Sequence, residues 1–221
     1  MNLMRKVPLI TNNAYHVFNR GVNKYDIFFS DSDYEHFLAA AKHYLTKNSK
    51  FSYEKYPSES NEPGSLQGSL KLEIAPRIEI LAYCLMPNHF HFLVKQLTDK
   101  GIASYMQRFI NSYVHYVNIK YKRVGPLFQG PFKGVRIESD DHLLHLSRYI
   151  HLNPLVSNLT ANLKDYKWSS YSSYFKGGED GFVKPNQVLK SFRSIKDYEK
   201  FVSDQEGYAR SLEQMKHLKD F

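Results

Sequence analysis

The spacing of apolar and polar residues near the start of the chain predicts a strand followed by a helix. Residues 14–21 (AYHVFNRG) alternate as expected for a strand with one buried face, and Arg20-Gly21 supplies a turn signal. Residues 30–45 begin with Ser and Asp side chains that can cap a helix. Helically spaced apolar positions follow at Tyr34, Phe37, Leu38, Ala41 and Leu45.

Residues 77–96 predict an antiparallel hairpin. Two strand-like runs, RIEILAYCLM and HFHFLVKQ, are separated by Pro87-Asn88, a pair that suits a tight turn. Residues 101–123 then predict the clearest helix in the chain, because one stripe carries Ile102, Tyr105, Met106, Phe109, Ile110, Tyr113 and Val117.

The pattern after residue 124 predicts one more strand and several helices. Residues 125–139 mix glycines with strand formers, which indicates an irregular strand. The next helix is expected to begin at Ser139 or Asp140 and to stop at Pro154. Short helices follow Trp168, including one at 194–206. The order β-α-β-β-α-β-α predicts an α+β fold with a ferredoxin-like, RRM-like antiparallel sheet, helices packed on it and extra C-terminal helices.

The chain is predicted to form one domain followed by a C-terminal helical extension at residues 176–221. Residues 46–76 are rich in Ser, Glu, Gly and Pro, so they are expected to form a polar loop or insertion. The chain has 221 residues, 42% of them hydrophobic, which suits a folded globular protein. It shows no membrane-length apolar run and no signal peptide, and its single cysteine, Cys84, suits a reducing cytoplasm.

Charge favours a polyanionic partner. The formal net charge is +8, and nucleic acid is the commonest polyanion. Between residues 118 and 136 the cations are Lys120, Lys122, Arg123, Lys133 and Arg136, with aromatic residues among them and no acidic residue. This mixture is typical of single-strand binding. Arg20 and Gln129 are further candidates for DNA contact. A solvated basic face whose aromatic residues belong to the core is the alternative.

His89 and His91 form the first candidate site. Residues i and i+2 of a strand share a face, so the two imidazoles project together, away from Phe90. Such a pair suits a divalent metal, although two ordinary histidines on an exposed strand would read the same way. Neither an H-x-H-x-H nor an H-E-x-x-H motif occurs. The common zinc sites are therefore disfavoured.

A second candidate group lies on the helix expected after Ser139. His145, Tyr149 and Asn153 follow one another at intervals of four residues and so share one helix face. Tyr149 could instead be a half-buried core tyrosine, and Asn153 a helix C-cap. His145 could accept a proton, but a surface or packing role suits it better. Trp168 and Tyr171 are assigned to packing.

Five blocks of the sequence together resemble the REP-associated tyrosine transposases, which are single-tyrosine HUH endonucleases. In order, the blocks are AYHVFNRG, LAYCLMPNHFHFLV, RVGPLFQGPFKG, RYIHLNP and YKWSSY, spread over residues 14–175. The resemblance implies that residues 1–175 form an HUH single-tyrosine transposase domain. It implies Tyr149 as nucleophile and His89, His91 and Asn153 as ligands of Mg²⁺ or Mn²⁺.

The activity implied by the resemblance is cutting and rejoining of single-stranded, hairpin-forming DNA through a covalent 5′-phosphotyrosine. Such a link conserves the energy of the cut strand, so no ATP is expected. A bacterial cytoplasm, with association to the nucleoid when DNA is bound, and a monomer or homodimer fit this activity. The first alternative is a non-catalytic single-strand-binding module on the same scaffold. A metal hydrolase without a tyrosine nucleophile is disfavoured because the motif blocks offer no obvious carboxylate base or ligand.

Overall fold

A computed structural model describes residues 8–46, 51, 75–178 and 181–205. The expected loop at 46–76 and the end of the C-terminal extension therefore lie almost wholly outside the described residues. Within the described part of the chain, no helix is long and apolar enough to cross a membrane. The elements are β1 (Ala14–Arg20), η1 (Val22–Lys24), α1 (Asp31–Thr46), β2 (Ile78–Met86), β3 (His89–Gln96), α2 (Gly101–Lys120), β4 (Lys133–Arg136), α3 (Asp140–Val156), η2 (Leu163–Asp165), α4 (Tyr171–Phe175), α5 (Asn186–Leu189) and α6 (Ile195–Ser203).

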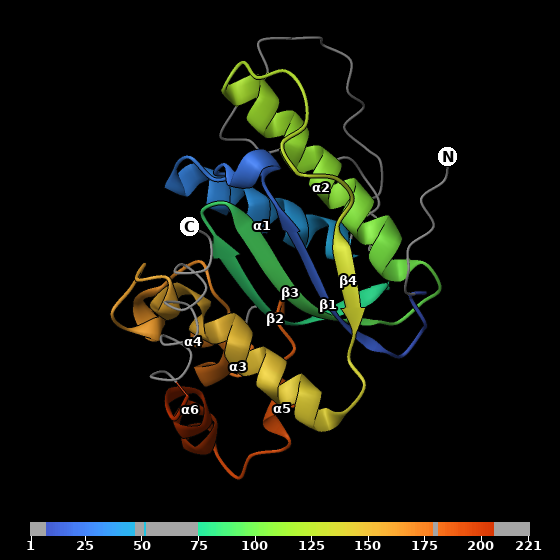
Figure 1. The fold of residues 1–221 in the computed structure, drawn as a ribbon. Helices are drawn as coiled ribbons and strands as arrows, with labels where there is room; N and C mark the ends of the chain where they lie inside the picture. Colours follow the sequence, from blue (N-terminus) through green and yellow to red (C-terminus); the bar gives the residue numbers. More distant parts are fainter. Residues whose placement is uncertain (1–7, 47–50, 52–74, 179–180, 206–221) are drawn as a thin grey trace.

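The predicted fold class is confirmed. The sheet has the order β2-β3-β1-β4, and all neighbouring strands are antiparallel, as in a ferredoxin-like fold. Helices α1 and α2 cover one face, while α3 crosses the other with the C-terminal helices beside it (Figure 1). Phe37 of α1 packs against Phe90 and Phe109, so the aromatic side of β3 faces α1 and α2. Residues that alternate with Phe90 consequently face α3.

The α3 helix begins as predicted but does not stop at Pro154. Ser139 caps it, because its side chain accepts a hydrogen bond from the His142 amide at 3.0 Å. The helix continues to Val156 with Pro154 inside it. Proline this close to the end removes one hydrogen bond of the final turn, and Pro154 itself is buried. The prediction of a stop at Pro154 was therefore wrong, and Asn153 lies within the helix instead of capping it.

The segment after α3 closes the outer edge of β2. Outward-facing backbone groups of an edge strand need partners when they are buried. The Leu85 amide donates to the Trp168 carbonyl at 2.9 Å, and the Ser170 amide donates to the Tyr83 carbonyl at 3.0 Å. Further along, the Lys184 amide donates to the Ile80 carbonyl at 2.8 Å. Trp168, Ser170 and Lys184 thus hold the edge of the strand that precedes the His89 hairpin turn.

His151 joins α3 to this edge and to α6. It is fully buried, with Nδ1 2.7 Å from the Tyr198 hydroxyl and Nε2 2.8 Å from the Ser170 hydroxyl. Burial lowers the pKa of His151 to about 3, so the ring is neutral at pH 7. Since Tyr149 lies two residues earlier on the same helix, these contacts fix the helix that carries it.

Replacing His151 by Phe should lower the free energy of unfolding at pH 7 by about 1–3 kcal/mol, because the buried hydroxyls of Tyr198 and Ser170 each lose one hydrogen-bond partner. A His with a lowered folded-state pKa stabilises the fold above its unfolded pKa of 6.5, and this stability is lost as the pH falls below that value. Between pH 7 and pH 5 the free energy of unfolding of the variant should therefore fall by about 2 kcal/mol less than that of the wild type.

Urea denaturation at both pH values measures these differences. His115→Ala on the exposed side of α2 serves as the control, and its effect should stay within about 0.5 kcal/mol. Equal stability of His151→Phe and wild type at pH 7 would contradict the assigned role of this histidine.

Candidate functional site

His89 and His91 lie at the start of β3, on the sheet face that meets α3. In the antiparallel register His89 is opposite Arg20 of β1, and His91 is opposite Phe18. The two imidazole rings lie 4.9 Å apart between centroids. Because directly opposite residues share a face, the register brings Arg20 beside the histidine pair. His89 and His91 thus project from the same face of β3, as predicted.

Both imidazoles are held in the neutral form. Burial, with a smaller contribution from the Arg20 charge, lowers the pKa of His89 to about 4. Burial also lowers the pKa of His91 well below its ordinary value, aided by the neighbouring His89, His16 and Arg20. A neutral ring keeps a nitrogen lone pair at pH 7, which a metal ligand requires.

One nitrogen of each ring is occupied by a neighbouring side chain. His89 Nδ1 lies 2.6 Å from Asn88 Oδ1, and His91 Nδ1 lies 2.8 Å from His16 Nε2. His91 Nε2 is buried and, among the described residues, has no hydrogen-bond partner. Sequence reasoning missed His16. Its strand alternates His16, Phe18 and Arg20 on one face, but only the pairing of β1 with β3 places that face beside His91.

Tyr149 of α3 stands next to this pair. Its ring centroid lies 5.6 Å from that of His91 and 6.3 Å from that of His16, edge-on in both cases. Tyr149 is 46% exposed, so part of this residue is accessible from solvent. The alternative of a core tyrosine therefore does not describe this residue.

Asn153 lies one turn after Tyr149. Its Nδ2 donates to the Tyr149 carbonyl at 2.8 Å, which leaves the amide oxygen as the side-chain atom that could bind a cation. Among the described residues there is no cluster of three or more His, Cys, Asp and Glu side chains. A metal at this place would rely on His89, His91 and an amide oxygen. Neutral nitrogen and oxygen donors, together with the orphaned His91 Nε2, fit Mn²⁺, and Mg²⁺ when phosphate oxygens complete its shell.

Five of the predicted DNA-binding residues form two groups, and the first lies near the histidine pair. Gln129 lies beside Arg20, because the backbone amide of Gln129 donates to the Arg20 carbonyl at 3.0 Å. Lys133 is opposite Phe18 and so shares the face of the histidines, whereas Arg136 is opposite Tyr15 and lies on the other face.

The second group lies at the end of α2. Lys122 is exposed, and Arg123 lies over the ring of Phe29 at 5.6 Å. Phe29 is itself 46% exposed and was not singled out from the sequence. This corner of the molecule therefore combines cations with an accessible aromatic ring, a combination that suits unpaired bases.

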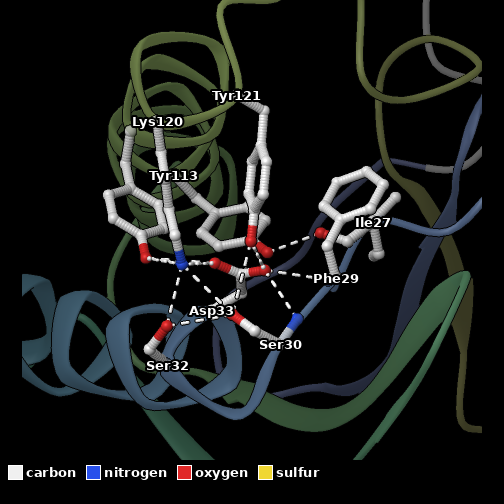
Figure 2. A network of polar contacts seen from close by, with 9 residues as sticks. Ile27, Phe29, Ser30, Ser32, Asp33, Tyr113, Lys120 and Tyr121 are labelled. Carbon is white, nitrogen blue, oxygen red and sulfur yellow. Dashed lines mark hydrogen bonds and ion pairs between the residues drawn. The ribbon is translucent and has the colours of Figure 1, made fainter.

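Lys120 is tied to a buried carboxylate instead. Its ammonium donates to Asp33 at 2.6 Å, and Asp33 also accepts from the backbone amides of Phe29 and Ser30 at 2.8 and 3.0 Å (Figure 2). The hydroxyls of Tyr116 and Tyr121 complete the shell of Asp33. Asp33 thereby bonds the residue before α1, as a capping box does, and joins α1 to the end of α2.

The remaining residues noted in the sequence have packing or surface contacts. Trp168 stacks on Tyr34 with 4.5 Å between ring centroids, and Tyr171 is buried. His145 is exposed, close to Arg148 and 3.4 Å from Asp141. These contacts agree with the packing and surface roles expected for the three residues.

A comparison with known protein families matches the part of the chain that contains the histidine pair and Tyr149. Residues 71–153 match the family described as "Transposase IS200 like". The resemblance found in the sequence is thus confirmed. The segment of this chain that matches the transposase family ends on Asn153 and includes His89, His91 and Tyr149.

A solved structure supports the fold. The structure described as the REP-associated tyrosine transposase bound to a REP hairpin is 15% identical in sequence. The match covers 82% of this chain and 88% of that chain, with a TM-score of 0.55. A search of curated proteins finds no match. Residues 71–153 are therefore similar to the IS200-like transposases, and most of the chain shares the fold of the REP-associated tyrosine transposase structure.

Proposed function

We propose that the protein is a metal-dependent endonuclease and strand transferase that acts on single-stranded, hairpin-forming DNA through Tyr149. The observation that carries this proposal is the accessible Tyr149 ring 5.6 Å from His91, whose buried Nε2 has no hydrogen-bond partner among the described residues. The IS200-like segment contains both residues, and the similar solved structure is described as bound to a REP hairpin.

In the proposed reaction the Tyr149 oxygen attacks the scissile phosphorus. A bond forms between this oxygen and the 5′-phosphate, the bond to the 3′-oxygen breaks, and that oxygen takes a proton to become a free 3′-hydroxyl. The phenol proton leaves to solvent. A later attack by a 3′-hydroxyl reverses these steps and rejoins DNA, so no nucleotide cofactor is consumed.

The phenol needs help because a free phenol, with a pKa near 10, is only about 0.1% ionised at pH 7. A divalent ion would supply charge neutralisation and polarisation of the phosphate. His89, His91 and Asn153 are the residues that would hold this ion. The rigid α3 helix keeps Tyr149 and Asn153 one turn apart, and the contacts of His151 fix that helix against the sheet.

The proposed DNA path uses Gln129 and the cations outside the Asp33 network. Arg20, Gln129 and Lys133 would hold the strand near the histidines. Lys122 and Arg123, with Arg136 at the other face, would contact phosphates further away. Lys120 keeps its ammonium on Asp33 and is left out of this path.

The test incubates wild-type protein with a library of hairpins that carry single-stranded flanks, in Mn²⁺, in Mg²⁺ and in EDTA. A covalent protein–DNA adduct should form with either metal and disappear with EDTA. Tight binding of the hairpins without any adduct would overturn the proposed catalysis and favour a binding module on the same scaffold. An adduct that forms equally in EDTA would overturn the metal dependence.

Replacing Arg20 or Lys133 by Gln should weaken hairpin binding and make it less sensitive to salt. Each phosphate contact on a single strand contributes about 0.7 to the slope of log affinity against log salt. We expect each variant to reduce the slope by about this amount, measured by fluorescence anisotropy at several salt concentrations. Lys196→Gln on the exposed side of α6 makes the same charge change and should leave the slope unaltered. An equal reduction of the slope by all three substitutions would contradict a DNA path localised near the histidines.

A further inference from the structure

His16 and Asn88 flank the histidine pair and determine which ring nitrogen each histidine offers. The Asn88 amide is oriented by a hydrogen bond from Nδ2 to the Lys24 carbonyl at 2.9 Å. Its oxygen therefore faces His89 Nδ1 at 2.6 Å. An amide oxygen only accepts, so His89 Nδ1 carries the proton and His89 Nε2 keeps the lone pair.

His16 lies beside Nδ1 of His91, as Asn88 lies beside Nδ1 of His89. His16 Nε2 lies 2.8 Å from His91 Nδ1, and the two rings are stacked with centroids 5.0 Å apart. A neutral imidazole has one donor and one acceptor nitrogen, so two arrangements are possible. If His91 Nδ1 donates to His16, the lone pair of His91 lies on Nε2. If His16 donates, the proton of His91 lies on Nε2 instead.

The surroundings of His91 Nε2 favour the first arrangement. This atom is buried without a hydrogen-bond partner among the described residues, so a proton there would have no acceptor, whereas a lone pair there can bind a metal ion. The first arrangement also makes the two histidines alike, because each then carries its proton on Nδ1 and its lone pair on Nε2. Metal-binding histidines generally donate their other ring nitrogen to a neighbouring acceptor, which fixes the ring and its tautomer.

We propose that His16 is a positioning residue that accepts the His91 Nδ1 proton and so holds His91 Nε2 as a metal ligand. This inference rests on the metal site of the proposed function. His16 would not touch the metal or the DNA phosphate. Its role is to keep the His91 ring in one orientation and one tautomer, as Asn88 does for His89.

The first test measures Mn²⁺ binding directly, by the electron paramagnetic resonance signal of free Mn²⁺, without DNA or turnover. His16→Phe keeps a ring of similar size but cannot accept a proton, and it should weaken Mn²⁺ binding about 10–100-fold. His16→Gln offers an amide oxygen as acceptor and should restore binding to within about 3-fold of wild type. His115→Gln on the α2 surface is the control and should change nothing.

The outcomes separate this inference from the proposed function. If His91→Ala binds Mn²⁺ as wild type does, or if wild type binds none, the metal site itself is wrong. If His91→Ala abolishes binding while His16→Phe leaves it unchanged, the metal site stands and the role of His16 is overturned.

A second measurement needs no substitution at His16. Nitrogen-15 NMR of the metal-free wild type distinguishes the two tautomers of a neutral histidine, and the His91 signals are assigned by their absence in His91→Ala. The proton of His91 is expected on Nδ1. A proton on Nε2 would overturn the inference even if His16→Phe failed to fold.

Discussion

Tyr149→Phe is expected to abolish the covalent protein–DNA adduct and to lower strand cleavage by at least about 10³-fold. The substitution removes only the hydroxyl, and the ring can keep its edge-on contacts with His91 and His16. Binding of the uncut hairpin should therefore stay within about 3-fold of wild type. Denaturing gels of labelled hairpin DNA measure the adduct and the cut strand, and fluorescence anisotropy measures binding.

Tyr25→Phe provides the matched control for this experiment. Tyr25 is 67% exposed in the loop before α1, so loss of its hydroxyl should leave both cleavage and binding unchanged. A Tyr149→Phe protein that still forms the adduct would show that another residue is the nucleophile.

Asp33→Asn is expected to lower the free energy of unfolding by about 3–5 kcal/mol, because it leaves the Lys120 ammonium without its buried counter-charge. Asp33 has no exposed side-chain surface and accepts five hydrogen bonds, of which the three from Tyr116, Lys120 and Tyr121 join α1 to the end of α2. Asparagine also turns an N–H₂ group toward donors that need an acceptor. Urea denaturation at pH 7 measures the change.

An exposed ion pair at the start of the same helix is the control for Asp33. Asp31 pairs with Lys167, and both side chains are more than half exposed. Lys167→Met should cost no more than about 1 kcal/mol. A similar loss of stability in Asp33→Asn and Lys167→Met would contradict the stabilising role assigned to the hydrogen bonds of Asp33.

The pH dependence of the Asp33 effect has a definite sign. Burial raises the pKa of Asp33, but hydrogen bonds from Lys120, the Phe29 amide and Tyr121 outweigh burial and hold the pKa below 3.8. A carboxyl with a lowered folded-state pKa stabilises the fold above its unfolded pKa, and the stability is lost as the pH falls below it. The difference between wild type and Asp33→Asn should therefore be constant above about pH 5 and shrink below pH 3.8.

Local patterns were sufficient for the order of elements and for the hairpin. Alternation along β1 and around Pro87-Asn88, and the apolar stripe of α2, are local properties, and the observed elements agree with them to within a few residues. The Ser139 cap was also visible, because a serine before a helical pattern has a direct physical role. The end of α3 was not, since burial of Pro154 and its neighbours sustained one more half-turn.

Contacts between distant strands and helices account for what the sequence did not reveal. The pairing of β1 with β3 places His16 beside His91, 75 positions away in the chain. Packing of α1 on α2 brings Asp33 to Lys120, a contact that the grouping of this lysine with the DNA-binding cations did not predict. Charge and spacing alone carry no information about such partners.

Mass spectrometry of the adduct identifies the residue that forms the bond to DNA, and this residue is expected to be Tyr149. Trypsin should release a peptide of residues 149–164 that contains a single tyrosine. After nuclease digestion, this peptide is predicted to carry a nucleotide attached through its 5′-phosphate to Tyr149. A nucleotide found on any other residue, or attached through a 3′-phosphate, would contradict the account.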